Sequence, residues 1–184
     1  MSKWTDHKKK WSFCTACPLH ERRKKVVLAR GKLPCDMLFV GEAPGASEDV
    51  LGRPFIGPAG KLLDSIIEEA VPDEVSIGFT NLVACIPKDE SGSKTKEPEQ
   101  DHIIACSNRL EEILKMAKPA VLIMVGKLSE KWMPSQFGDD IAETWISVIH
   151  PAALLRMDAS QKPLAIQRTI VTLRDAAEEL TVPF

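Results

Sequence analysis

Long apolar runs are missing from this 184-residue sequence: none approaches the roughly 20 residues that a membrane-spanning helix requires. The first residues are rich in lysine and contain no apolar stretch of the kind found in secretory signals. A strong charge of one sign is also missing, since 24 basic residues face 26 acidic ones. With 44% hydrophobic residues, the composition excludes a disordered or collagen-like chain. We therefore expect a cytoplasmic, monomeric protein of one compact domain, residues 1–184, that has no membrane partner.

The small net charge conceals an uneven distribution along the chain. Residues 1–32 carry ten lysines and arginines and only two acids, a net charge of +8, and the remaining residues carry −10. A basic segment joined to an acidic body suggests that one face binds a polyanion. A solvated, lysine-rich helix explains the same charge equally well, so charge alone leaves both interpretations open.

The five cysteines are not expected to form disulfides in a cytoplasmic protein. Cys14 and Cys17 form a CxxC pair, and Cys35, Cys85 and Cys106 follow at wide intervals. Four thiolates brought together by the fold could bind zinc or an iron–sulfur cluster. A redox pair is a weaker interpretation, because this CxxC does not follow a strand of a thioredoxin-like unit. The three later cysteines could also be inert buried thiols, so the spacing alone does not decide.

Short apolar segments alternate with segments of helical periodicity. The predicted strands are residues 36–41, 75–84, 120–126 and 145–149, and the predicted helices are 61–70, 99–118, 127–133 and 163–180. This alternation predicts an α/β fold, a three-layer α/β/α sandwich with a central four-stranded parallel sheet. Ligands of such sheets bind beyond the carboxyl ends of the strands. We therefore expect residues 41–55, 81–85 and 150–156 to meet at one edge.

Glycine and proline are concentrated between Gly41 and Gly60, directly after the first predicted strand. Such glycines let the backbone approach a ligand closely. The segment has neither the Gly-Lys-Ser/Thr of a Walker A loop nor the GxGxxG of a dinucleotide site. We expect Pro54 to leave Phe55 on a stiff, extended segment, where its ring either stacks on a ligand or caps the core.

Four motifs follow one another in the chain. They are Cys14-Thr-Ala-Cys-Pro-Leu19, Gly41-Glu-Ala-Pro-Gly45, Thr80-Asn-Leu-Val-Ala-Cys85 and His150-Pro-Ala-Ala-Leu-Leu-Arg156. The second motif is continued by the blocks Glu48-Asp49, Gly52-Arg-Pro-Phe55, Gly57-Pro-Ala-Gly60 and Leu63-Asp64. Their order and the four-cysteine pattern together resemble the family 4 uracil-DNA glycosylases, the iron–sulfur members of the uracil-DNA glycosylase superfamily. The resemblance implies hydrolysis of the N-glycosidic bond of uracil in DNA, single- or double-stranded. The products would be free uracil and an abasic site, the first step of base excision repair.

The resemblance also assigns Cys14, Cys17, Cys85 and Cys106 to a [4Fe–4S] cluster and leaves Cys35 as a plain thiol. The expected role of the cluster is structural. It would tie the basic N-terminal segment 1–35, which carries two of the ligands, and the 86–105 loop to the rest of the domain.

For the substrate base, the resemblance implies a pocket that holds uracil flipped out of the DNA. Gly41 would allow close backbone approach, and Phe55 would stack on the ring. The Asn81 amide would pair with O4 and N3–H of uracil, because an amide both donates and accepts, whereas cytosine presents the reversed pattern. Glu48 would lie near C5 and help to exclude the methyl group of thymine.

For the reaction, His150 would donate a hydrogen bond to uracil O2 as negative charge develops on the leaving base. Glu42 is the carboxylate best placed to orient water or to stabilise the oxocarbenium-like sugar. The best-known member of the superfamily has its catalytic aspartate one position later, where this chain has Ala43. Arg156 would bind a DNA phosphate. No lysine lies in these motifs, so we expect no Schiff base and an intact abasic site as the product.

The same side chains also have simpler interpretations. Asn81 could cap a strand end, His150 and Arg156 could have partners in the core, and Glu48 and Asp49 could be solvated.

Residues 86–105, between Cys85 and Cys106, make a longer spacing than the family leads us to expect. A related branch forms a covalent adduct with DNA through a histidine in this region, but residues 86–98 contain none. Two other classes of protein remain as alternatives: a catalytically silent iron–sulfur DNA-binding accessory of the same fold, and a zinc-bound nucleic-acid module. The joint presence of Glu42, Phe55, Asn81 and His150 favours the enzyme.

Overall fold

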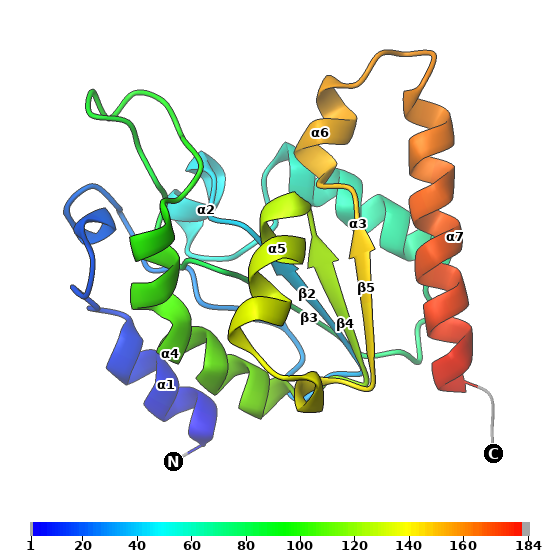
Figure 1. Ribbon diagram of the computed structural model, residues 1–184, viewed down its shortest axis with the longest axis horizontal. Coiled ribbons are helices and arrows are strands. Elements are labelled where there is room, and N and C mark those ends of the chain that lie inside the picture. Colours follow the sequence, from blue (N-terminus) through cyan, green and yellow to red (C-terminus); the bar gives the residue numbers. More distant parts are fainter. Residues whose placement is uncertain (1, 182–184) are drawn as a thin grey trace.

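The computed structural model describes residues 2–181, and its centre is a five-stranded sheet with strand order β1-β3-β2-β4-β5 (Figure 1). The strands are β1 (Arg30–Gly31), β2 (Met37–Gly41), β3 (Ile77–Asn81), β4 (Val121–Val125) and β5 (Thr144–Val148). The last four pair in parallel, whereas the edge strand β1 is antiparallel to β3. The predicted α/β class is confirmed. The predicted four-stranded, wholly parallel sheet was wrong, because a two-residue strand such as β1 is too short to show any alternation.

Helices cover both faces of this sheet. They are α1 (Lys3–Trp11), α2 (Ala46–Leu51), α3 (Pro58–Ala70), α4 (Gln100–Ala117), α5 (Lys127–Gln136), α6 (Pro151–Arg156) and α7 (Lys162–Thr181), with 3₁₀ turns η1 (Pro18–Glu21) and η2 (Asp139–Ile141). Met37 and Phe39 of β2 lie in one core with side chains of α3, α6 and α7. Leu38 and Val40 lie in the other core with side chains of α4 and α5. Both faces of β2 are therefore buried, as its unbroken apolar run predicted. None of the helices within residues 2–181 is long and apolar enough to cross a bilayer.

The helix predicted at 61–70 begins three residues earlier, at Pro58. Proline is well suited to the first helical position, because its missing N–H would have no partner there in any case. Leu63, Ile66, Ile67 and Ala70 are buried at the spacing of one helical face.

The N-terminal helix α1 is fastened to α4 through one carboxylate. Glu112 of α4 accepts hydrogen bonds from His7, Lys10 and Trp11 of α1. Although burial opposes its charge, these three bonds lower the pKa of Glu112 to about 2. The basic N-terminal segment is therefore held against the helix that carries Cys106.

The carboxyl ends of the four parallel strands lie together at the upper edge of the sheet in Figure 1. In the register of β2 and β3, Gly41 pairs with Asn81, and both are the last residues of their strands. His150 follows two residues after the end of β5 and immediately precedes α6. The topology thus brings three distant parts of the chain to one edge.

Candidate functional site

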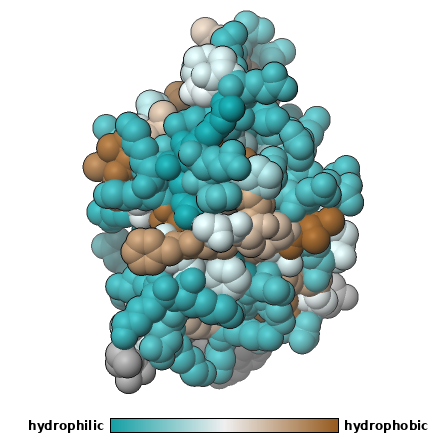
Figure 2. Space-filling model, turned by 90° about the vertical axis from the view of Figure 1, so that its left-hand side faces the viewer, coloured by the Kyte–Doolittle hydropathy of each residue, from teal (hydrophilic) through white to brown (hydrophobic). Residues whose placement is uncertain are grey.

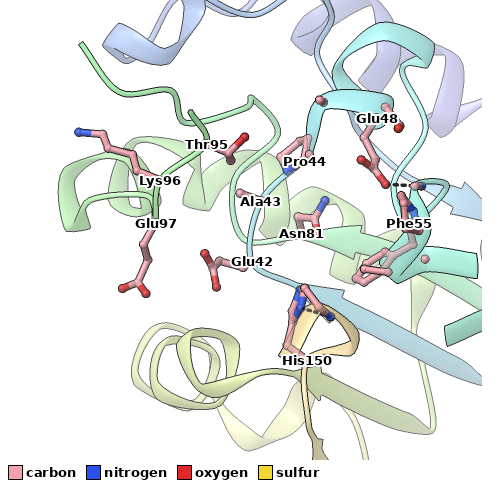
Figure 3. Close-up of a pocket in the computed structure, with 18 of the residues that line it drawn as sticks. Glu42, Ala43, Pro44, Glu48, Phe55, Asn81, Thr95, Lys96, Glu97 and His150 are labelled. Carbon is pink, nitrogen blue, oxygen red and sulfur yellow. Dashed lines mark hydrogen bonds between the residues drawn. The ribbon is translucent and has the colours of Figure 1, made fainter. Parts of the chain in front are cut away.

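A cavity of about 560 Å³ opens at this edge, and we call it the edge cavity (Figure 3). It is lined by residues of the 42–60 segment, by the end of β3 and by the 150–156 segment, together with three residues of the 86–98 loop. Among its lining residues are six of the side chains singled out in the sequence: Glu42, Glu48, Phe55, Asn81, His150 and Arg156.

Gly41, the remaining residue singled out in the sequence for base binding, leaves space for the side chains of Phe55 and Asn81. A Cβ atom at this position would lie 2.4 Å from Cζ of Phe55 and 2.5 Å from Oδ1 of Asn81. No residue larger than glycine therefore fits without displacing one of them. Asn81 is only 3% exposed, yet it lines the edge cavity, between Glu42 and Phe55 in Figure 3. A buried amide that faces a cavity is equipped to bind a polar ligand, since leaving it unpaired is costly.

Phe55 is not on an extended segment, as the sequence suggested, but has a left-handed backbone with φ of +53°. Arg30 of β1 holds this conformation: its Nε donates to the carbonyl of Pro54 at 2.8 Å and its Nη2 to that of Phe55 at 3.1 Å. The same guanidinium pairs with Asp64 and lies over the ring of Phe79, with 3.7 Å from Cζ to the ring centroid. Arg30 was not recognised in the sequence, because only the fold brings it to the 54–55 backbone.

Glu48 and Asp49 are both buried, so the solvated alternative was wrong for each. Glu48 Oε1 accepts hydrogen bonds from the backbone N–H groups of Ile56 (2.9 Å) and Gly57 (2.8 Å). Asp49 accepts a hydrogen bond from the N–H of Lys24 at 2.7 Å. Glu48 therefore fixes the chain that follows Phe55, and Asp49 ties α2 to the N-terminal segment.

His150 is held as a neutral hydrogen-bond donor. Its Nδ1 accepts a hydrogen bond from the N–H of Ala152 at 3.2 Å, which assigns the ring proton to Nε2. Burial lowers the pKa of His150, and the positive charge of Arg156 lowers it further. The ring passes close to Gly126, where a Cβ atom would lie 2.9 Å from the Cβ of His150. Gly126, with φ of +93°, was not singled out in the sequence.

Glu42 lines the edge cavity beside the 86–98 loop. The sequence did not reveal that this loop also lines the cavity. Burial raises the pKa of Glu42, and the nearby carboxylate of Glu97 raises it further. Thr95, Lys96 and Glu97 line the cavity on this side. Only the unusual length of the 86–98 loop hinted at such a role, since these residues belong to no motif. Lys96 is paired with Glu99, the N-cap residue of α4, with 2.5 Å between Nζ and Oε1.

Arg156 lies at the mouth of the edge cavity and is exposed to solvent. A partner in the core is therefore excluded. Its guanidinium is free to meet an anion that approaches the cavity from outside.

The predicted set of four cysteines, Cys14, Cys17, Cys85 and Cys106, lines a second cavity, which we call the cysteine cavity. It lies between the N-terminal segment, the chain that follows β3, and α4. Figure 2 views the molecule from the side of α1 and α4 and shows a band of apolar side chains crossing a mostly hydrophilic surface. Cys35 does not line this cavity; it is buried in the core, and burial raises its pKa to about 12.

Four cysteines are a donor set that zinc or a [4Fe–4S] cluster can use. Within residues 2–181, no three His, Cys, Asp or Glu side chains lie close enough together to hold one metal ion. Zinc needs its ligands at about 2.0–2.3 Å, whereas the thiolates of a [4Fe–4S] cluster bind separate irons and stand further apart. Two arginines, Arg23 and Arg109, also line the cavity, and Arg23 Nη1 donates to Sγ of Cys85 at 3.5 Å. Positive charge at this position favours bound thiolates.

Several known proteins of similar sequence are type-4 uracil-DNA glycosylases. The chain is 37% identical over 130 residues to the type-4 uracil-DNA glycosylase of Sulfurisphaera tokodaii, covering 70% of this chain and 57% of that protein. It is 38% identical over 113 residues to that of Thermotoga maritima, covering 61% and 56%. It is 28% identical over 160 residues to that of Archaeoglobus fulgidus, covering 77% and 78%. The chain thus spans little more than half the length of the first curated relatives that it matches.

The fold agrees with this relationship. The crystal structure of SMUG2 from Pedobacter heparinus superposes with a TM-score of 0.60 at 13% identity, over 79% of this chain and 76% of that one. The family model of the uracil DNA glycosylase superfamily matches residues 29–174, which include the whole edge cavity. The protein therefore belongs to the uracil-DNA glycosylase superfamily.

Proposed function

We propose that the protein is a uracil-DNA glycosylase, which hydrolyses the N-glycosidic bond of deoxyuridine and leaves an abasic site for base excision repair. The observation that carries this proposal is the edge cavity. An aromatic ring, a buried amide, a neutral histidine donor and a carboxylate line one space there. The type-4 uracil-DNA glycosylases among the relatives support the same activity.

In this proposal the cavity recognises the base by stacking and by the amide of Asn81. Phe55, held in its left-handed conformation by Arg30, presents its ring to a base that has been flipped out of the DNA. The Asn81 amide accepts from N3–H and donates to O4, a pairing that cytosine reverses. Glu48, fixed by its bonds to the 56–57 backbone, is our candidate for excluding the thymine methyl group.

The bond to the sugar breaks as negative charge moves onto the leaving base. His150 donates from Nε2–H to uracil O2, and because the ring is neutral it offers a hydrogen bond without delivering a proton in advance. Glu42 orients the attacking water or stabilises the oxocarbenium-like sugar. Its raised pKa makes it a stronger base than an exposed glutamate. Arg156 at the mouth binds a phosphate of the substrate strand.

We further propose that Cys14, Cys17, Cys85 and Cys106 hold a [4Fe–4S] cluster, whose chemistry here is to cross-link the chain rather than to take part in the reaction. The cysteines come from the N-terminal segment, the chain after β3, and α4. The N-terminal segment 1–35 then belongs to one domain with the rest of the chain. We propose a monomer that acts on uracil-containing DNA, either single- or double-stranded.

The direct test incubates the purified protein with an end-labelled oligonucleotide that contains one uracil, and then treats one half of the sample with alkali and keeps the other half unheated at neutral pH. We expect a strand break at the uracil only after alkali. Tight binding without any abasic site would identify a catalytically silent accessory protein instead. A break without alkali would indicate Schiff-base chemistry, and Lys96→Ala would then be the first variant to test, because Lys96 is the lysine among the lining residues of the edge cavity.

A further inference from the structure

Arg109 of α4 is a completely buried cation, 1% exposed, and it holds the end of β3 in place. Its Nη2 donates to the carbonyl of Asn81 at 2.6 Å and to that of Leu82 at 2.7 Å. Its Nη1 donates to Oγ1 of Thr80 at 3.0 Å. Three consecutive residues are thus fixed by one guanidinium, and the middle one carries the amide that faces the edge cavity.

The other side of Arg109 faces the cysteine cavity. The residue lines that cavity one helical turn after Cys106. Its Nε is buried and has no hydrogen-bond partner among the described residues. None of the ion pairs between the residues that the structure describes includes Arg109. A buried guanidinium without a counter-charge is strongly disfavoured. Negative charge in the cysteine cavity would therefore stabilise Arg109.

We propose that Arg109 is a positioning residue that couples the cysteine cavity to base recognition. Thiolates that bind a cluster bring negative charge next to the guanidinium and stabilise it in its buried position. The guanidinium in turn fixes the backbone carbonyls of Asn81 and Leu82, and so orients the amide of Asn81 in the edge cavity. This inference rests on the proposed function and on the cluster proposed above.

Arg23 provides a comparison with matched charge. It also lines the cysteine cavity and touches Sγ of Cys85, but it is partly exposed and makes no hydrogen bond to residues 80–82. Arg23→Gln and Arg109→Gln therefore both remove one positive charge beside the cysteines. Only Arg109→Gln also releases the backbone of Asn81.

The experiment uses the iron-loaded protein and two measurements: the reduction potential of the cluster, and the inhibition constant of free uracil in the excision assay. Both glutamine variants are expected to lower the potential, because a nearby positive charge stabilises the more negative, reduced cluster. Arg109→Gln is expected to raise the inhibition constant of uracil about tenfold, the usual consequence of misplacing one buried hydrogen-bonding group. Arg23→Gln is expected to change it less than about twofold. Arg109→Lys retains the charge without the planar fork, so it should restore the potential but not the affinity for uracil.

Equal uracil inhibition constants for Arg109→Gln, Arg23→Gln and wild type would overturn the coupling. If the Arg109 variants do not fold, the wild-type protein still tests the inference. Coupling between uracil binding and the cluster must act in both directions. Saturating uracil should then shift the reduction potential of the wild-type cluster, and an unchanged potential would contradict the inference. A wild-type protein that neither excises nor binds uracil would instead contradict the proposed function, whatever the variants do.

Discussion

The edge cavity and the cysteine cavity are both lined by the chain at and after the end of β3: Asn81, the last residue of the strand, lines the first, and Cys85, four residues later, lines the second. The edge cavity is held by hydrogen bonds within the protein, from Arg30 to the 54–55 backbone and from the 56–57 backbone to Glu48. In the cysteine cavity, burial raises the pKa of Cys17, and it raises that of Cys85 to about 11. Burial therefore disfavours the thiolate form of Cys17 and Cys85 in the protein without iron. Hydrogen bonds within the protein shape the first cavity, whereas in our proposal the second is completed by the cluster.

The largest expected effect is the loss of the cluster, which concerns the cysteine cavity and not the edge cavity. The wild-type protein should contain about four irons. Cys14→Ala or Cys106→Ala should lose them, because each substitution removes one ligand of the cluster, whereas Cys35→Ser should keep them. Iron analysis and the visible absorption of anaerobically purified protein measure this. A protein that needs Cys35 but tolerates the loss of Cys106 would show that the ligand assignment is wrong.

His150→Ala probes the edge cavity alone. It should lower single-turnover excision by roughly 10²–10³-fold, the usual range for loss of one donor to a developing anion. DNA affinity should change little, because phosphate contacts dominate it. Since the pKa of His150 is lowered, the neutral donor form persists at neutral pH, and this ring should add no pH dependence above pH 7. The thermal midpoint measured on the same sample is the control: a variant that melts early yet cleaves normally per folded molecule would remove His150 from the reaction.

Asn81→Asp is expected to have a smaller effect on the same cavity. Uracil excision should fall by about 10–10²-fold, because the carboxylate accepts where the amide donated to O4. Preference should shift toward cytosine, and the iron content should stay that of the wild type. Excision rates on paired oligonucleotides with uracil or cytosine at one position measure both changes. Unchanged uracil activity would exclude the Asn81 amide from base recognition.

Glu112→Gln tests how firmly α1 is held on the cysteine side. Because its folded pKa is lowered from 4.5 to about 2, Glu112 contributes stability above pH 4.5 that is lost as the pH falls toward 2. Glutamine should cost about 1 kcal/mol at pH 7 after allowance for solvent screening, and less at pH 3. Urea unfolding at the two pH values measures this. Glu111→Gln, which removes an exposed pair with Lys115, is the control and should change the stability by less. Equal losses for both variants would contradict the assigned role of Glu112.

The sequence predicted those features that local patterns determine. The four parallel strands are short apolar runs, and α3, α4 and α7 carry clear helical periodicity. The rule that ligands bind beyond the carboxyl ends of parallel strands then predicts that Glu42, Asn81 and His150 lie close together. The helices α2 and α6 have six residues each, too few to show a helical period, and both were missed.

Features that depend on contacts between distant residues could not be predicted. The left-handed backbone of Phe55 is held by Arg30, 25 residues earlier in the chain. The burial of Arg109 depends on three acceptors at the end of β3, 27 to 29 residues before it. No local pattern distinguishes these arginines from the solvated ones around them. The contribution of Thr95, Lys96 and Glu97 to the edge cavity likewise follows from the path of a loop, not from a motif.

The most direct test of the account is the identity of the base that the wild-type protein releases. Three oligonucleotides that differ only in carrying uracil, cytosine or thymine at one position are incubated with the iron-loaded protein, and the freed bases are identified by mass. We predict stoichiometric release of free uracil from the first and no base from the other two. Release of thymine at a comparable rate, or no release of uracil from DNA that the protein binds, would contradict the assignment of the edge cavity as a uracil site.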